Sequence, residues 1–165
     1  MPNSVNTTGA LIDHHLMMVG RLVNNATLCD LILFSAFKVI SGCNDKIASA
    51  IYFASEALFS KKNIITRMLN ALDDATEKEI VERIISAAEK SQNQRNELSH
   101  ALLKISGADN RLSRTNPRFP DREKPVTAPY LDSLLKASSQ AHLDAHLAFQ
   151  ELCQKRGIPV SISLE

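Results

Sequence analysis

Residues 11–40, LIDHHLMMVGRLVNNATLCDLILFSAFKVI, carry the pattern that decides the fold. Asp30 is the only ionised residue on the apolar stripe of this stretch. The stripe recurs at the spacing of an α-helix and consists of Ile12, Leu16, Val19, Val23, Ala26, Leu33, Phe37 and Ile40. The stretch therefore predicts one long helix as the first element of the protein.

The segments after this helix continue the helical pattern with short interruptions. Gly42 is a natural helix terminator, and Asn44 or Asp45 can cap a second helix that extends to Leu58. The polar residues KKN (61–63) interrupt the pattern, and a third, short helix is expected over 64–72. The second and third helices are also compatible with one kinked rod.

A fourth helix is predicted from Thr76 and Glu79, which have the spacing of a capping box. Its apolar positions continue to Ile105, and Gly107 is the expected terminator. Residues 107–127 combine Pro, Asn, Gly and alternating charge, so we expect a long basic loop there. A last helix is expected over 128–155. Apart from the short tail VSISL (160–164), no segment has the pattern of a strand.

These elements predict an all-α protein, an up-and-down bundle of four to five helices. The chain has 165 residues, enough for one domain that buries most of its apolar surface without metals or disulfides. We expect a single domain over 1–165, with a core bundle over 10–106, the basic loop over 107–127 and the C-terminal helix over 128–155.

The composition argues against several classes of protein. The three cysteines are widely spaced and form neither a CxxC metal motif nor a disulfide framework, and we find no signal peptide or membrane span, so a cytoplasmic protein is expected. The net charge of +1 gives no global attraction for nucleic acid, but residues 104–125 hold six cations and three acids and offer a local one. The first 60 residues hold only three cations and four acids, which fits a homodimer interface or an internal core helix.

The segment RNELSH, residues 95–100, lies near the end of the predicted fourth helix. Arg95 falls on the apolar stripe of that helix, so its charge needs a partner or a solvated crevice. Asp30 is one candidate partner, and a guanidinium that extends past the stripe to water is the alternative. Asn96 and His100 are four residues apart and share a face, whereas Arg95 and His100 differ by about 140° around the helix.

RNELSH resembles the R-x4-6-H motif of the HEPN superfamily, in which the position after Arg is often Asn, as Asn96 is here. The resemblance implies a compact helical bundle that dimerises and brings Arg and His of both protomers into one cleft. Many HEPN members are metal-independent endoribonucleases of toxin, abortive-infection or RNA-processing systems. Others bind RNA, nucleotides or partner proteins. For this chain the resemblance implies a homodimer, an RNA substrate, an antitoxin-type protein partner and no cofactor.

The same resemblance makes Arg95, Asn96 and His100 the candidate catalytic residues. RNA cleavage without a metal needs a base for the 2′-hydroxyl, an acid for the leaving 5′-oxygen and a cation for the phosphorane-like charge. Histidine suits acid or base chemistry because imidazole titrates near neutral pH, and Arg95 can bind a phosphate bidentately. Asn96 could orient His100 or a phosphate oxygen. The expected products are a 2′,3′-cyclic phosphate and a 5′-hydroxyl.

Other polar residues leave alternatives open. The patch formed by Asn24, Asn25, Thr27 and Asp30 lines a cleft opposite Arg95 and His100 or is simply the solvated side of the first helix. His142 and His146 stand one helical turn apart, but two nitrogens do not make a zinc site, so packing or surface histidines are expected. The alternative function is a non-catalytic interaction or ligand-binding bundle in which RNELSH is structural and Arg95 pairs with Asp30.

Overall fold

The computed structural model describes residues 4–100, 102–106, 111–116 and 119–159. The helices in this part of the chain are α1 (Ser4–Ser41), α2 (Asp45–Tyr52), α3 (Leu58–Asn70), α4 (Ala75–Ser99) and α5 (Ala128–Lys155). Three strands, β1 (Leu102–Ser106), β2 (Arg111–Asn116) and β3 (Phe119–Pro125), lie between α4 and α5. The prediction of a helical bundle is confirmed, and the C-terminal helix covers the predicted residues.

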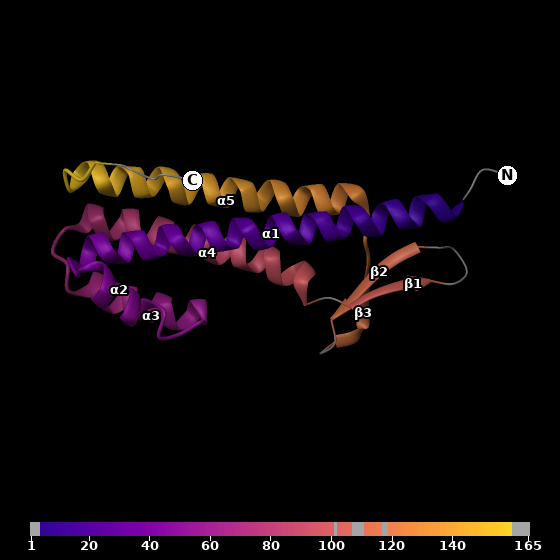
Figure 1. Ribbon diagram of the computed structural model, residues 1–165, viewed down its shortest axis with the longest axis horizontal. Coiled ribbons are helices and arrows are strands. Elements are labelled where there is room, and N and C mark those ends of the chain that lie inside the picture. Colours follow the sequence, from indigo (N-terminus) through magenta and orange to yellow (C-terminus); the bar gives the residue numbers. More distant parts are fainter. Residues whose placement is uncertain (1–3, 101, 107–110, 117–118, 160–165) are drawn as a thin grey trace.

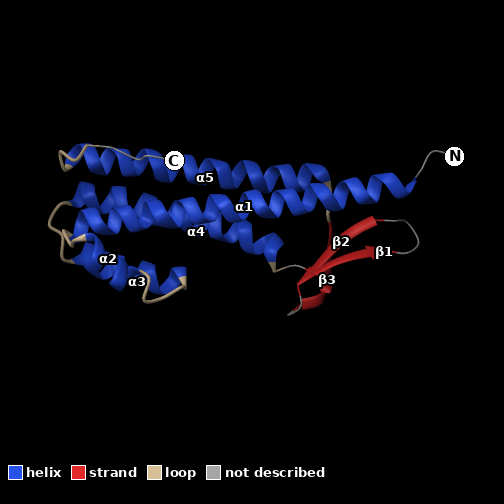
Figure 2. Ribbon diagram, viewed as in Figure 1, coloured by secondary structure: helices blue, strands red, loops and turns tan. Residues whose placement is uncertain are grey.

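Three long helices, α1, α4 and α5, lie side by side and form the body of the protein (Figure 1). Helix α4 runs opposite to α1 and α5. The short helices α2 and α3 form a hairpin beside one end of this bundle, and the sheet lies toward the other end (Figure 2). Each of the three long helices therefore packs on the other two, and a shared core lies between them.

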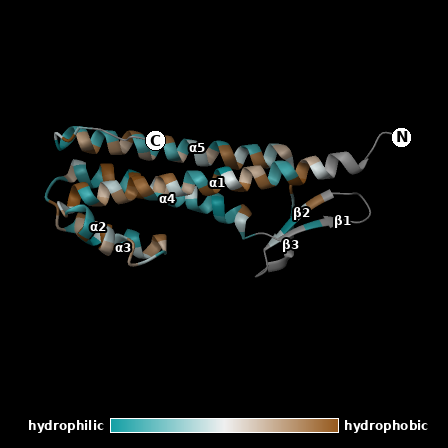
Figure 3. Ribbon diagram, in the orientation of Figure 1, coloured by the Kyte–Doolittle hydropathy of each residue, from teal (hydrophilic) through white to brown (hydrophobic). Residues whose placement is uncertain are grey.

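The side of α1 that faces the core differs from the predicted stripe in its N-terminal half. Leu16 is 60% exposed and Val23 is 39% exposed, although both were expected to be internal. His15, Met18 and Leu22 are buried in this half instead. Farther along α1 the predicted positions Ala26, Leu33, Phe37 and Ile40 are buried, together with Cys29, Ile32 and Ala36. Apolar residues occur on more than one side of α1 (Figure 3), so helical periodicity alone did not determine which side is buried.

Several predicted helix ends are confirmed, and others are corrected. Gly42 has φ 65° and follows α1, and the Asn44 side chain accepts a hydrogen bond from the Ile47 N–H at 3.0 Å, which caps α2. The cap of α4 is Asp74, not Thr76, because the Asp74 carboxylate accepts from the Glu77 N–H at 3.0 Å. Helix α4 ends at Ser99 rather than near Gly107.

Helices α2 and α3 are separate helices, not one kinked rod, because α2 ends at Tyr52 and α3 begins at Leu58. The predicted second helix to Leu58 is therefore too long, and the KKN residues (61–63) lie inside α3 instead of interrupting the helical pattern. A charged network holds this hairpin against α1. Asp30 accepts a hydrogen bond from the Tyr52 hydroxyl at 2.8 Å and forms an ion pair with the Lys61 ammonium at 2.6 Å. The ammonium also lies 4.7 Å from the Tyr52 ring centroid and 5.1 Å from the Phe53 ring centroid.

The predicted loop over 107–127 is wrong for the described residues in this range, which form most of an antiparallel sheet with strand order β1-β2-β3. Strand β1 occupies residues that were expected to continue the fourth helix. Leu112 on β2 packs in a second core cluster with Met18, Leu22 and Leu98. The next residue on the same face of the strand is Arg114, which is also buried. A charged residue at an inward-facing position breaks the alternation of apolar and polar residues from which a strand is predicted. The VSISL tail lies outside the described residues.

Helix α1 is long and apolar enough, by length and composition, to cross a membrane. A core helix of a soluble protein passes the same test, and α1 packs on both α4 and α5. The structure therefore gives only weak support to a membrane location.

The Asp30–Lys61 pair provides a test of how the α2–α3 hairpin is held. The Lys61 side chain is 6% exposed, so Lys61→Met leaves the Asp30 carboxylate without its cation and should lower the free energy of unfolding by about 2 kcal/mol. Lys62→Met is the matched control. Its pair with Glu89 is much more exposed, and the change should stay within about 0.5 kcal/mol. Urea unfolding followed by circular dichroism measures both. Equal effects would contradict the assigned role of Lys61.

Candidate functional site

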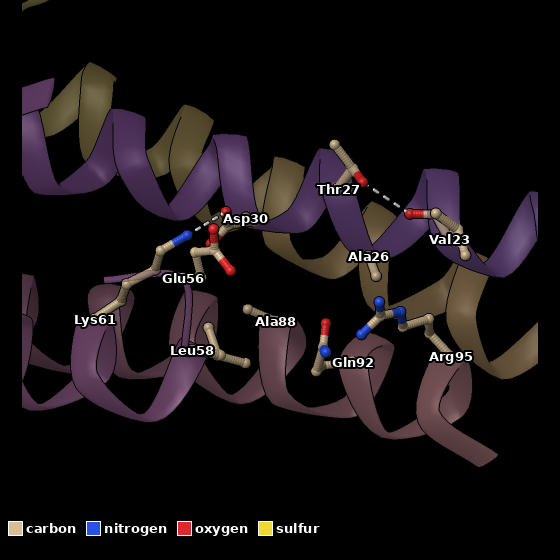
Figure 4. Close-up of a pocket in the computed structure, with 10 residues that line it drawn as sticks. All are labelled: Val23, Ala26, Thr27, Asp30, Glu56, Leu58, Lys61, Ala88, Gln92 and Arg95. Carbon is tan, nitrogen blue, oxygen red and sulfur yellow. Dashed lines mark hydrogen bonds and ion pairs between the residues drawn. The ribbon is translucent and has the colours of Figure 1, made fainter. Parts of the chain in front are cut away.

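The Arg95 side chain lies in a cavity between α1, α3 and α4 (Figure 4). The cavity has a volume of about 220 Å³. Polar side chains of both charge signs line it together with apolar ones: Val23, Ala26, Thr27, Asp30, Glu56, Leu58, Lys61, Ala88, Gln92 and Arg95. The structure thus places Arg95 beside a solvated crevice, one of the two surroundings that its position on the stripe required.

The predicted ion pair between Arg95 and Asp30 is not formed. Asp30 is engaged by Lys61 and Tyr52 instead, although it lines the same cavity as Arg95. No ion pair joins Arg95 to a carboxylate within the part of the chain that the structure describes. A half-buried guanidinium with unused donors, open to a cavity, is suited to binding an anion.

Asn96 holds Arg95 in place. Its side-chain oxygen accepts hydrogen bonds from Arg95 Nη1 at 3.1 Å and from Gln92 Nε2 at 3.2 Å. Asn96 had been expected to orient His100 or a phosphate oxygen. The contacts that the structure gives it are to Arg95 and Gln92, so the Asn96 side chain is placed to orient the guanidinium.

His100 does not line the Arg95 cavity. It is the residue that follows the last turn of α4, with φ −101° and ψ 3°, and its side chain is exposed. The structure of one chain therefore brings Arg95 and Asn96 together and leaves His100 on the surface at the helix end. Thr27 and Asp30, from the polar patch on α1, line the cavity with Arg95, whereas Asn24 and Asn25 do not, so the predicted cleft is formed only in part. Asn25 instead donates to the Ser139 hydroxyl on α5 at 3.3 Å.

Glu97, inside RNELSH, faces the sheet. Its carboxylate forms an ion pair with Arg114 and accepts a hydrogen bond from the Tyr130 hydroxyl at 3.2 Å, and Lys124 lies 3.9 Å away. Arg114 Nη1 also donates to the main-chain carbonyl of Glu97 at 2.8 Å. Burial is the main cause that raises the pKa of Tyr130 to about 12, so its hydroxyl remains a donor at neutral pH. Glu97 therefore anchors the sheet on α4.

The sequence prediction missed Arg114 as a structural residue, because it was grouped with the basic loop. Arg114 is 8% exposed and lies over the Tyr130 ring, 5.1 Å from the centroid. Lys104 lies 3.3 Å from Glu123. The side chains of Arg111, Arg118 and Arg122 fall outside the described part. Within the described part, the basic segment is therefore largely paired rather than a free surface for RNA.

His15 is buried near Arg114 at the junction of α1 and the sheet. Its side chain is 3% exposed, and among the described residues neither His15 Nδ1 nor Arg114 Nε has a hydrogen-bond partner. Burial, and then the positive charge of Arg114, lowers the pKa of His15 below its ordinary value. The neutral imidazole is therefore the form that fits this junction.

His142 and His146 lie one turn apart on α5. A ring nitrogen of His146 lies 3.1 Å from Gln150 Nε2. Burial, and then the neighbouring His146, lowers the pKa of His142. The described residues include no group of three or more His, Cys, Asp or Glu side chains that could hold a metal ion.

Comparisons with protein-family models, with curated proteins and with solved structures give no match to this chain. The three predicted site residues are therefore distinguished by their geometry alone. Arg95 faces a cavity, Asn96 supports it, and His100 is exposed at the end of α4. Gln92, Glu56 and Lys61 complete the cavity and were not predicted as site residues. The one sequence feature that pointed to Lys61 was the polar segment KKN (61–63) between apolar residues.

The surroundings of His15 predict a pH dependence of stability. Because the folded-state pKa of His15 is lowered, the unfolded chain binds its proton more readily, and stability falls as the pH drops through about 6.5. The free energy of unfolding should therefore be smaller at acidic than at neutral pH. His15→Gln should reduce this dependence without abolishing it, since His142 contributes in the same direction. Urea titrations over a pH series measure it, and an unchanged pH slope in the variant would contradict the assignment.

Proposed function

We propose that the chain binds RNA through Arg95 and cleaves it without a metal ion, with His100 as the acid or base. The observation that carries the proposal is the half-buried Arg95 guanidinium, which faces a cavity and has no carboxylate partner among the described residues. A phosphate group is a natural ligand for such a donor set. The exposed imidazole of His100, at the end of the same helix, supports the catalytic part of the proposal.

The chemistry requires few groups. A base removes the 2′-hydroxyl proton, and the 2′-oxygen then attacks the adjacent phosphorus. The P–O5′ bond breaks as an acid protonates the leaving 5′-oxygen. Arg95 would stabilise the charge on the phosphoryl oxygens, with its direction set by Asn96. Glu97, which would repel RNA if its charge were free, is engaged by Arg114 and Tyr130.

The proposed site needs a second copy of the chain. Arg95 and His100 diverge by about 140° around α4, so one protomer does not direct both side chains at the same phosphate. Helix α1 offers a surface for the partner, because Leu16, Val23 and Leu31 are exposed on one face of it. Val23 also lines the Arg95 cavity. A homodimer that covers this face would bring a partner protomer close to Arg95 and could supply its His100.

A second candidate is a non-catalytic bundle that binds a ligand or a partner protein. One observation favours it: the cavity that contains Arg95 does not include His100. Cleavage activity separates the two candidates.

Single-stranded RNA of mixed sequence, incubated with the protein in EDTA, tests the nuclease proposal. The wild-type protein should give products that end in a 2′,3′-cyclic phosphate and a 5′-hydroxyl. Arg95→Ala and His100→Ala should each lower the rate by roughly 100-fold or more, because each removes a group that acts in the transition state.

His142→Ala is the control, since this histidine lies on α5 away from the cavity lining. It should cleave at the wild-type rate. Equal activity in all four proteins would show that cleavage comes from a contaminant, and an inactive wild type would leave only the second candidate.

The molecular mass of the protein in solution tests the proposed homodimer. Analytical ultracentrifugation should give twice the chain mass of 18.2 kDa for the wild type. Leu31→Glu places a charge on the proposed interface and should give monomers that retain their helical circular dichroism. Leu143→Glu, at an equally exposed leucine on α5, should remain dimeric. A monomeric wild type, or a dimeric Leu31→Glu, would rule out this face as the interface.

A further inference from the structure

We propose that the Arg95 cavity binds a small zwitterion, a compound with one anionic group and one ammonium group a few atoms apart. Two ionised side chains in the cavity, Arg95 and Glu56, have no ion-pair partner among the described residues. They carry opposite charges, and Figure 4 shows them toward opposite ends of the lining, with Ala88 and Gln92 between them. A ligand that matches both must itself carry both charges.

The other two charges in the cavity are already satisfied. Asp30 and Lys61 form an ion pair at 2.6 Å, and the Tyr52 hydroxyl donates to Asp30 at 2.8 Å. This network is firmly held, because the Lys61 side chain is only 6% exposed. The Asp30–Lys61–Tyr52 network therefore forms a rigid part of the cavity lining and adds little net charge to it. Among the described residues, the unpaired charges of the lining are therefore the half-buried Arg95 and the exposed Glu56, which Figure 4 shows on the side of the Asp30–Lys61 pair.

The middle of the cavity suits a short carbon chain. Ala26, Leu58 and Ala88 provide apolar surface there. Gln92 donates its amide N–H to Asn96, so its carbonyl oxygen is the part of the amide that remains to accept from a ligand ammonium. Arg95 is preorganised by the same Asn96 oxygen. Binding therefore requires little rearrangement of these two side chains.

The volume limits the ligand. Pockets for drug-sized molecules have volumes of about 300–1,000 Å³, and this cavity has about 220 Å³. The ligand is therefore the size of a single amino acid or of an amino alcohol phosphate. The anionic group can be a carboxylate or a phosphate, because a guanidinium binds either. When the anionic group of the ligand is bound to Arg95, an RNA phosphate cannot bind there, so the ligand would inhibit the proposed nuclease. The binding site itself does not require His100.

Two-dimensional NMR titration of the ¹⁵N-labelled protein tests the proposal. The zwitterions are glycine, β-alanine, 4-aminobutyrate and O-phosphoethanolamine, and the single-charge probes are acetate, inorganic phosphate and ethylamine. At least one zwitterion should bind roughly tenfold more tightly than the probe that carries only its anionic group. The shifted resonances should belong to residues that line the cavity.

Three variants separate the two charged ends. Glu56→Gln should lower the zwitterion affinity by roughly tenfold and leave acetate or phosphate binding unchanged, because only the ammonium contact is lost. Arg95→Gln should weaken both. Glu82→Gln, at an exposed carboxylate of α4 outside the cavity lining, should change neither.

The outcomes distinguish this site from the proposed nuclease. The zwitterion site is overturned if inorganic phosphate or acetate binds as tightly as the zwitterions, if Glu56→Gln has no effect, or if no probe shifts a cavity resonance at about 20 mM. RNA cleavage that depends on Arg95 and His100 would stand in each of those cases. Zwitterion binding that depends on Glu56, in a protein that does not cleave RNA, would support the site and leave the nuclease proposal alone rejected.

Discussion

The contact between Arg114 and Glu97 determines where α4 ends, and the position of RNELSH depends on it. The last carbonyls of a helix lack partners inside the helix, and the last turn of α4 contains no basic residue of its own. Arg114 supplies that cation from β2, with one donor to the Glu97 carbonyl and another to the Glu97 carboxylate. Strand β1 begins three residues beyond Ser99, so the sheet and the end of the helix are built around one guanidinium.

This contact divides RNELSH into residues with different roles. Leu98 is 1% exposed and belongs to the core shared with the sheet, and Glu97 is bound to Arg114. Arg95 lines the cavity, Asn96 accepts a hydrogen bond from its guanidinium, and His100 is exposed beyond the helix. The structural interpretation of the motif therefore applies to Glu97 and Leu98, whereas the proposed function concerns the other residues. The Arg95–Asp30 pair that the structural interpretation included is not formed, since Lys61 takes that place.

The sequence predicted the elements that depend on local patterns. The long first helix, its end at Gly42, the Asn44 cap and the last helix all follow from periodicity and capping chemistry, and all are present. The sheet was missed because Arg114 occupies an inward position of β2, where an apolar residue is expected. The partner of Asp30 was missed because Lys61 lies 31 residues away, in a segment that local rules assign to a helix boundary. The buried side of α1 was ambiguous since both sides carry apolar residues. Arg95 could be singled out from sequence, but the cavity could not, because it needs three helices to form.

A double-mutant cycle between Glu97 and Arg114 tests most directly whether their contact ties the sheet to α4. Urea unfolding of the wild type, Glu97→Gln, Arg114→Met and the double variant gives the coupling free energy. The structure predicts a coupling of about 2 kcal/mol or more, because Glu97→Gln leaves the buried Arg114 without its anionic partner and Arg114→Met leaves Glu97 without its main cation. A coupling below about 0.5 kcal/mol, the value for an exposed surface pair, would contradict this account of how α4 ends.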